Sequence, residues 1–225
     1  MKKILNFCII AVFFITACTQ PEAESETAPT NTPHADEINT EAPTTVPEKE
    51  TEEAKMEKGK VAVVIARDRY QSLEYNPVVY HLTEAGYEIV VVSDELGTAM
   101  GTQENTEIQM AFTDVDTSEF KAIVLIGGSK SLWENEELHS LLIEMQAEGK
   151  LVSAICYGTV TLAYAGVIKD GDKVCWYNST ESDPVMESFG IFDTHADVTY
   201  GDRMITADGP SSAEEFAKAV AAYLG

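Results

Sequence analysis

Positive charge is scarce in this 225-residue chain. It carries 15 lysine and arginine residues against 38 aspartate and glutamate residues, which gives a formal net charge of −23 at pH 7. A surface this acidic repels the phosphate backbone of nucleic acids and the anionic headgroups of lipids. We therefore expect no nucleic-acid partner. The acidity leaves the class of substrate open.

Cysteine and histidine are also rare, with four residues of each. No pair of Cys-x-x-Cys motifs and no His-x-x-x-His motif is present, and His81, His139 and His195 stand singly. Because metal sites are generally built from clustered ligands of these types, the sequence predicts no metal site, and we expect no cofactor. Only Cys156 and Cys175 fall in the globular part of the chain. One disulfide between them is permitted outside the cytoplasm, but their spacing does not require it.

The N-terminus has the pattern of an export signal. Two lysines follow Met1, and residues 4–17 are almost wholly apolar, a length typical of a signal peptide and short for a membrane span. The run ends in Ile-Thr-Ala-Cys18, which resembles a bacterial lipobox. The resemblance implies cleavage after residue 17, acylation of Cys18 and a lipid-bilayer partner, so we expect an extracytoplasmic protein anchored by lipid to the bacterial cell membrane. An ordinary secretory signal or an uncleaved anchor are the alternatives.

Residues 18–58 are predicted to form the lipidated cysteine and a disordered linker. This stretch contains five prolines among many acidic, threonine and alanine residues, and its large aliphatic residues are Ile38 and Val46. It cannot bury enough apolar surface to offset the loss of chain entropy on folding. Residues 59–225 are long enough for one domain with an ample core.

Apolar runs alternate with amphipathic stretches throughout this domain. Strands are predicted at residues 60–66, 87–93, 121–126, 151–155, 172–177, 197–200 and 203–206. Helices are predicted from Asn76-Pro77, over residues 138–145, after Cys156, and from a capping box at Ser211-x-x-Glu214. This alternation predicts an α/β fold with a mostly parallel central sheet flanked by helices.

Cys156 stands where the buried strand 151–155 meets the following helix. A side chain at such a corner projects from the carboxyl end of the sheet, beside the free N–H groups of the helix N-terminus. These groups stabilise a thiolate, so we expect a lowered pKa and a reactive nucleophile. The alternative is a small buried residue that only packs, because free cysteine is commonly buried.

Four blocks of residues 59–225 resemble the ThiJ/PfpI family of the class I glutamine amidotransferase-like superfamily. They are KVAVVIARDRYQSLEYNPVVYHLTEAGYEIVVVS, AIVLIGGSKSLWENEELHSLL, KLVSAICYGTVTLAYAGVI and MITADGPSSAEEFAKAVAAYL. The resemblance covers nearly the whole domain and implies a flavodoxin-like three-layer sandwich. Members of the family often form dimers or larger assemblies, which implies a homodimer or a higher homo-oligomer.

The resemblance also assigns site residues. Cys156 falls on the family's nucleophile, and Glu74 on the acidic residue whose carboxyl contacts that sulfur. Gly128 and Tyr157 fall where backbone N–H groups form the oxyanion site. Many enzymatic members have histidine directly after the cysteine or at the end of the next strand. Here Tyr157 follows the cysteine directly, and the end of the next strand contains Trp176 and Tyr177. These aromatic residues could form a wall at the mouth of the site or simply pack in the core.

Three functions are consistent with these residues. Cys156 could attack a small electrophilic carbonyl or amide, in the manner of glyoxalase-, deglycase- or amidase-like members, with Glu74 as acid or base. It could instead be a redox or stress-sensing cysteine that is oxidised to sulfenic acid. The third alternative is a catalytically inert surface scaffold, because the chain lacks an obvious Cys-His pair.

Overall fold

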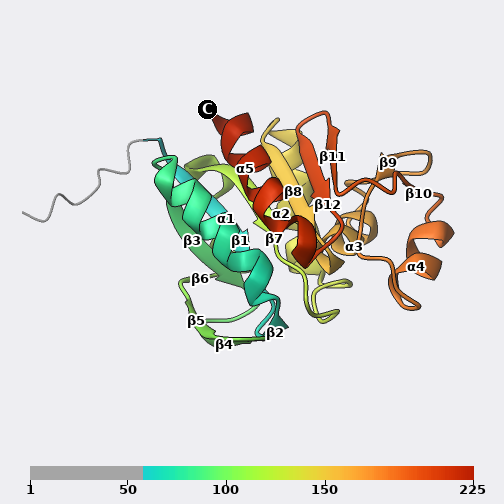
Figure 1. Cartoon of the computed structure of the whole chain (residues 1–225). Coiled ribbons are helices and arrows are strands. Elements are labelled where there is room, and N and C mark those ends of the chain that lie inside the picture. Colours follow the sequence, from blue (N-terminus) through green and yellow to red (C-terminus); the bar gives the residue numbers. More distant parts are fainter. Residues whose placement is uncertain (1–57) are drawn as a thin grey trace, which may run out of the picture. The chain divides into compact units, whose positions relative to one another are not determined.

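A computed structural model describes residues 58–225 of the chain (Figure 1). The predicted signal peptide, the predicted lipidation at Cys18 and the predicted linker up to residue 57 lie outside the described residues. Within residues 58–225, no helix combines the length and the hydropathy that a membrane span requires.

A seven-stranded sheet forms the middle layer. Its strand order is β11-β12-β8-β7-β1-β3-β6, and every neighbouring pair is parallel except β11 with β12. The strands are β1 (Lys60–Val64), β3 (Glu88–Ser93), β6 (Met110–Ala111), β7 (Phe120–Leu125), β8 (Leu151–Ile155), β11 (Val198–Gly201) and β12 (Met204–Ala207). This arrangement confirms the predicted mostly parallel sheet.

Helices cover both faces of this sheet. Figure 1 shows α1 (Ser72–Glu84) and α5 (Ala213–Leu224) packed side by side over one face. Helices α2 (Glu136–Ala147) and α3 (Tyr157–Tyr164) cover the other. Strand β1 is apolar after Lys60 because alternate residues enter different cores. Val61 and Val63 lie below α1 and α5, and Ala62 and Val64 lie below α2 and α3. The predicted flavodoxin-like three-layer sandwich is therefore confirmed.

Both helices on the first face begin differently from the prediction. Helix α1 starts at Ser72, capped by the Gln71 side chain, and Pro77 lies inside it. The proline is tolerated because Leu73, whose carbonyl loses its helical partner, is exposed to solvent. Helix α5 follows a 3-10 turn, η3 (Pro210–Ser212), and has no side-chain cap. The predicted capping box is therefore wrong.

Shorter elements surround the carboxyl ends of the sheet. Strands β2 (Asp68–Tyr70), β4 (Gly97–Gly101) and β5 (Asn105–Ile108) form a small sheet in which β4 and β5 make a hairpin. A second ribbon joins β9 (Lys173–Val174) to β10 (Phe192–Asp193), and α4 (Ser182–Ser188) lies between them in sequence. Two 3-10 turns, η1 (Phe112–Asp114) and η2 (Thr117–Glu119), precede β7. Strand β9 is shorter than the predicted residues 172–177, because the Cys175 N–H donates to the Thr206 hydroxyl instead of a strand partner.

Candidate active site

Cys156 occupies the corner between β8 and α3, as the sequence predicts. Its backbone has φ 60° and ψ −127°, a conformation that an L-residue adopts only under strain. The Cys156 N–H donates to the Ala207 carbonyl at 2.9 Å, which holds the corner against β12. Gly158 permits the tight entry into α3, since a Cβ there would lie 2.8 Å from the Leu125 carbonyl oxygen. The corner is therefore held from two neighbouring strands.

Two glycines after β7 form the opposite wall. A Cβ at Gly127 would lie 2.9 Å from the Cys156 sulfur, so this position has room only for glycine. Gly128 has φ 106°, and a Cβ there would lie 2.4 Å from the Arg69 carbonyl oxygen. The backbone N–H groups of Gly128 and Tyr157 lie beside the Cys156 sulfur and lower the pKa of its thiol. The structure thus brings together the cysteine and the two donors that the resemblance assigns to it.

Glu74 lies in the first turn of α1 and is fully buried. Its Oε2 accepts the N–H of Gly127 at 2.9 Å, whereas Oε1 has no partner of ordinary hydrogen-bond geometry among residues 58–225. Burial raises the pKa of Glu74 from 4.5 to about 7, against the opposing hydrogen bonds from Gly127 and the Cys156 thiol. Glu74 is therefore a buried partner of the thiol, and both of its protonation states are populated near neutral pH.

The pKa of Cys156 shifts in the direction opposite to the sequence prediction. Burial raises it most, and the negative charge of Glu74 raises it further, while the N–H groups of Tyr157 and Gly128 lower it. The prediction from the corner position included the N–H groups of the helix N-terminus, which favour the thiolate. It did not include the loss of water around the buried sulfur, which disfavours the thiolate. The effect of Glu74 on the pKa of Cys156 requires an ionised carboxylate, so protonation of Glu74 removes this effect. The negative charge of this pair therefore lies on Glu74 when it ionises, and Cys156 remains a thiol.

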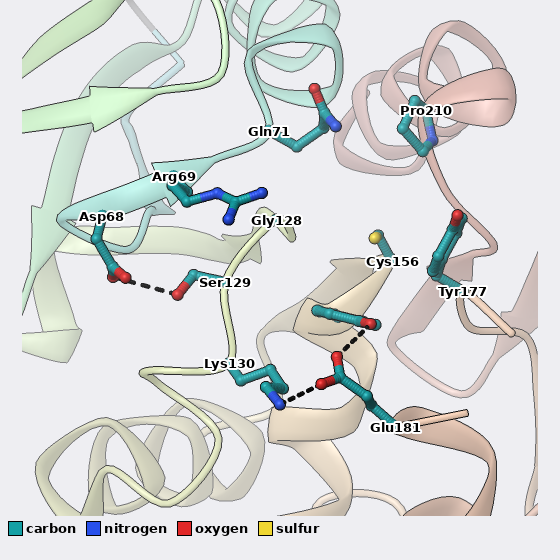
Figure 2. Close-up of a pocket in the computed structure, with 11 residues that line it drawn as sticks. Asp68, Arg69, Gln71, Gly128, Ser129, Lys130, Cys156, Tyr177, Glu181 and Pro210 are labelled. Atoms are coloured by element: carbon teal, nitrogen blue, oxygen red, sulfur yellow. Dashed lines mark hydrogen bonds and ion pairs between the residues drawn. The ribbon is translucent and has the colours of Figure 1, made fainter. Parts of the chain in front are cut away.

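A pocket of about 470 Å³ opens above Cys156 (Figure 2). It is lined by Asp68, Arg69, Gln71, Gly128, Ser129, Lys130, Cys156, Tyr157, Tyr177, Glu181 and Pro210. Tyr177 therefore lies where the sequence suggests an aromatic wall. Trp176 does not line this pocket, because it is buried and its indole N–H donates to Asp183 Oδ1 at 2.9 Å. Of the two proposed wall residues, Trp176 instead packs in the core.

The Tyr157 side chain is fixed at the mouth of the pocket. Its hydroxyl donates to Glu181 Oε2 at 3.0 Å and lies 3.1 Å from the Ser179 hydroxyl. Lys130 Nζ forms an ion pair with the other Glu181 oxygen at 2.5 Å. The Tyr157 ring packs edge-on against Trp133 and against Tyr177. The residue that replaces histidine is therefore a rigid part of the rim.

The three histidines of the described domain are engaged away from Cys156. His81 lies 2.9 Å from Glu214, the His139 ring lies 2.8 Å from the Trp133 carbonyl oxygen, and His195 lies 3.1 Å from Asp193. None of these lines the pocket. Across the described range, no group of three or more His, Cys, Asp or Glu side chains could hold a metal ion.

Cys156 and Cys175 are both free thiols. The Cys175 thiol donates to the Thr206 carbonyl at 3.2 Å, and the residue is 1% exposed. Cys156 is 6% exposed and lines the pocket. The two cysteines therefore differ in access to solvent, and no disulfide joins them.

Sequence reasoning missed several residues that shape this site. Gly127 anchors the Glu74 carboxylate, Lys130 and Glu181 pair at the rim, and Arg69 projects into the pocket. A glycine pair after a predicted strand is a sequence signal that could have identified Gly127. No local pattern marks the other three, because they meet only when distant loops converge.

Known proteins share both the sequence pattern and the fold. The profile described as DJ-1/PfpI family matches residues 59–223. An uncharacterized protein of Methanocaldococcus jannaschii is 32% identical over 165 residues, which cover 72% of this chain and 80% of that protein. A deglycase of Pyrococcus abyssi is 29% identical, over 65% of this chain and 84% of the relative. The crystal structure of a ThiJ/PfpI domain protein from Brachyspira murdochii is 27% identical with a TM-score of 0.69, over 73% of this chain and 95% of that one.

Proposed function

Because this chain belongs to the DJ-1/PfpI family, we propose that Cys156 is a nucleophile for small electrophilic carbonyl or amide compounds, in a glyoxalase-, deglycase- or amidase-like reaction. One observation carries this proposal: Cys156 lies in a strained strand-to-helix corner at an open pocket, packed against Gly127, whose N–H holds the buried Glu74 carboxylate. The similarity to a deglycase supports the same class of chemistry.

The proposed addition moves one proton and one electron pair. The thiol proton passes to the Glu74 carboxylate, and the sulfur forms a bond to the carbonyl carbon. The π electron pair of the carbonyl moves to its oxygen, near the N–H groups of Gly128 and Tyr157, and Glu74 returns the proton to that oxygen. A carboxyl with a pKa of about 7 suits both transfers. The product is a neutral hemithioacetal when the substrate is an aldehyde.

Hydrolysis should be slower than this addition. Turnover first requires a thioester, which forms when an amide adduct expels its amine, or when the carbinol hydrogen of a dicarbonyl adduct moves to the neighbouring carbonyl carbon. A water molecule that attacks this thioester and releases the thiol needs a general base, and no histidine is among the pocket-lining residues that the structure describes. Glu74 is enclosed next to the sulfur and already serves the addition. We therefore expect slow turnover of carbonyl compounds.

Aldehydes should protect Cys156 from alkylation. With glyoxal or methylglyoxal present, we expect iodoacetamide labelling of Cys156 to fall at least tenfold while labelling of Cys175 stays unchanged, because only Cys156 lines the pocket. Mass spectrometry of the full chain follows each residue, and chromatography follows conversion of the aldehyde to a hydroxy acid. The Cys156→Ser variant should lose conversion and Cys175→Ser should retain it. Equal conversion by the Cys156→Ser variant would contradict the proposal.

A redox role is the second candidate, favoured by the absence of imidazole from the described lining of the pocket. In this reaction the Cys156 thiolate attacks a peroxide oxygen, a sulfur–oxygen bond forms, and hydroxide leaves with the electrons of the O–O bond. Dimedone labelling at Cys156 after peroxide, without aldehyde protection, would favour this role. The absence of both reactions would favour the inert scaffold.

We also propose that the mature protein is a lipoprotein of the cell envelope. The support is the sequence: a basic N-terminus, an apolar run and Ile-Thr-Ala-Cys18. In a bacterial host, Cys18→Ser should abolish incorporation of labelled palmitate and move the protein out of the membrane fraction. Cys8→Ser is the matched control, because Cys8 lies in the segment that cleavage would remove. Wild-type labelling of the Cys18→Ser variant would contradict the proposal.

A further inference from the structure

We infer that Arg69 makes the Cys156 pocket selective for electrophiles that carry a carboxylate beside the reacting carbon. This inference rests on the proposed function, since it names the substrate class of the same pocket. Arg69 belongs to β2, on the side of the pocket that faces the Cys156 corner. In Figure 2 its guanidinium extends from β2 into the pocket.

The other charged side chains of the pocket already have partners. Lys130 pairs with Glu181 at 2.5 Å, and Glu181 also accepts the Tyr157 hydroxyl. Asp68 Oδ1 accepts the hydroxyls of Ser129 at 3.1 Å and Ser131 at 2.9 Å, so it points away from the Arg69 guanidinium (Figure 2). Within the described part of the chain, Arg69 has no ion pair and no side-chain hydrogen bond. Its guanidinium is therefore the positive charge of the pocket that remains available to a ligand.

The backbone at Arg69 is strained in a way that positions this side chain. Arg69 has φ 54°, which is uncommon outside glycine, asparagine and aspartate. The register of β2 against β4 shifts between Asp68 and Tyr70, so Arg69 is the bulged residue. The Tyr70 hydroxyl donates to the Glu104 carbonyl, which fixes the strand beyond the bulge. Bulges beside active sites commonly redirect a side chain, and here the bulge places Arg69 in the pocket.

The same bulge connects Arg69 to the proposed oxyanion site. Its carbonyl oxygen lies against Gly128, where a Cβ would approach to 2.4 Å. Two residues later, the Gln71 N–H donates to the Gly127 carbonyl at 3.0 Å. The Arg69 backbone therefore packs against the Gly127–Gly128 loop, which lies beside the Cys156 sulfur.

A carboxylate is the anion that best fits this arrangement. A guanidinium presents parallel N–H donors that match the two carboxylate oxygens. Residues 59–225 carry 27 acidic and 10 basic residues, so the domain as a whole repels anions. An anionic substrate would need a local positive charge to enter the pocket, and Arg69 supplies it.

Two alkylating agents of nearly equal size test this inference without any turnover. Iodoacetate carries a carboxylate and iodoacetamide is neutral; with either, the Cys156 sulfur bonds to the methylene carbon, iodide leaves with its electron pair, and the thiol proton goes to solvent. The readout is the ratio of the two labelling rates at Cys156, measured by mass spectrometry on the full chain. Because a change in thiol reactivity affects both reagents, the ratio isolates the effect of ligand charge.

Because Arg69 is exposed, we expect Arg69→Gln to lower the iodoacetate-to-iodoacetamide ratio by at most about fivefold at low salt, the upper end of the range for an exposed ion pair. Arg69→Lys should keep most of the ratio. Arg67→Gln is the matched control. This substitution removes the same positive charge two residues away, and Arg67 pairs with Glu95 outside the pocket. In the wild type, 1 M NaCl should reduce the ratio toward that of Arg69→Gln.

An unchanged ratio in Arg69→Gln, or an equal fall in Arg67→Gln, would overturn the inference. If Arg69→Gln does not fold, a wild-type ratio that is insensitive to salt would overturn it as well. Failure of the proposed function gives a different result: aldehydes would not protect Cys156 from alkylation, while the iodoacetate-to-iodoacetamide ratio would still depend on Arg69. If aldehydes do protect, glyoxylate should protect at lower concentration than glyoxal in the wild type but not in Arg69→Gln.

Discussion

Replacing Glu74 with glutamine should raise the free energy of unfolding at pH 8 by about 3 kcal/mol. Burial raises the pKa of this carboxyl from 4.5 to about 7, and each pH unit between these values corresponds to ~1.4 kcal/mol. Between pH 4.5 and 7 the folded state binds more protons than the unfolded state, so the stability due to this group falls as the pH rises. Glutamine keeps the shape and can accept the Gly127 N–H, but it has no charge to desolvate.

The advantage of the variant should vanish near pH 4, where Glu74 is protonated in both states. Urea unfolding at pH 4, 6 and 8 measures this difference. Glu84→Gln is the matched control, since Glu84 ends the same helix and is exposed, so its effect should be small at every pH. Glu74→Leu should be less stable than Glu74→Gln, because it leaves the buried Gly127 N–H without an acceptor. A pH-independent difference between wild type and Glu74→Gln would contradict the raised pKa.

Cys156 should react with iodoacetamide at least tenfold faster than Cys175 in the folded protein. Cys156 lines the pocket and has two N–H groups beside its sulfur. Cys175 is 1% exposed and its thiol donates to the Thr206 carbonyl. Labelling each residue from pH 6 to 12 and following it by mass spectrometry gives both rates and the pH at which each rate rises, its midpoint. Equal rates would reduce Cys156 to a packed core residue.

The midpoint for Cys156 should fall in the Glu74→Gln variant. The negative charge of Glu74 is the second-largest cause of the raised pKa of Cys156, and the substitution removes it. A like charge disfavours the thiolate, so its removal should move the midpoint to lower pH. Glu74→Leu also removes the charge but offers no N–H to the thiolate, so its midpoint should fall less. An unchanged midpoint would show that the carboxyl and the thiol do not interact.

The sequence was sufficient for the fold and for the position of the central cysteine. Strand 151–155 is apolar apart from Ser153 because both of its faces are buried, and this signal is local. The corner at Cys156 follows from the same run and the helical pattern after it. Glu74 could be assigned only through the family resemblance, because nothing local distinguishes a buried acid from a solvated one in the first turn of a helix.

The errors have a common physical origin in contacts between distant segments. Trp176 turns into the core because Asp183 accepts its indole N–H. The pKa of Cys156 depends on desolvation by residues from several loops. Arg69 adopts its strained conformation because β2 meets β4 with a bulge and its carbonyl meets Gly128. Each of these contacts joins residues that no short sequence window contains.

The hydrogen bond between Gly127 and Glu74 makes assembly of the site a proton-linked event. The two residues are 53 positions apart in sequence, so this contact exists only in the folded chain. In the unfolded chain Glu74 is hydrated and has an ordinary pKa, whereas burial raises this pKa to about 7 in the folded state. Folding therefore takes up protons at this carboxyl between pH 4.5 and 7, and mild acid favours the assembled surroundings of Cys156 over the unfolded chain.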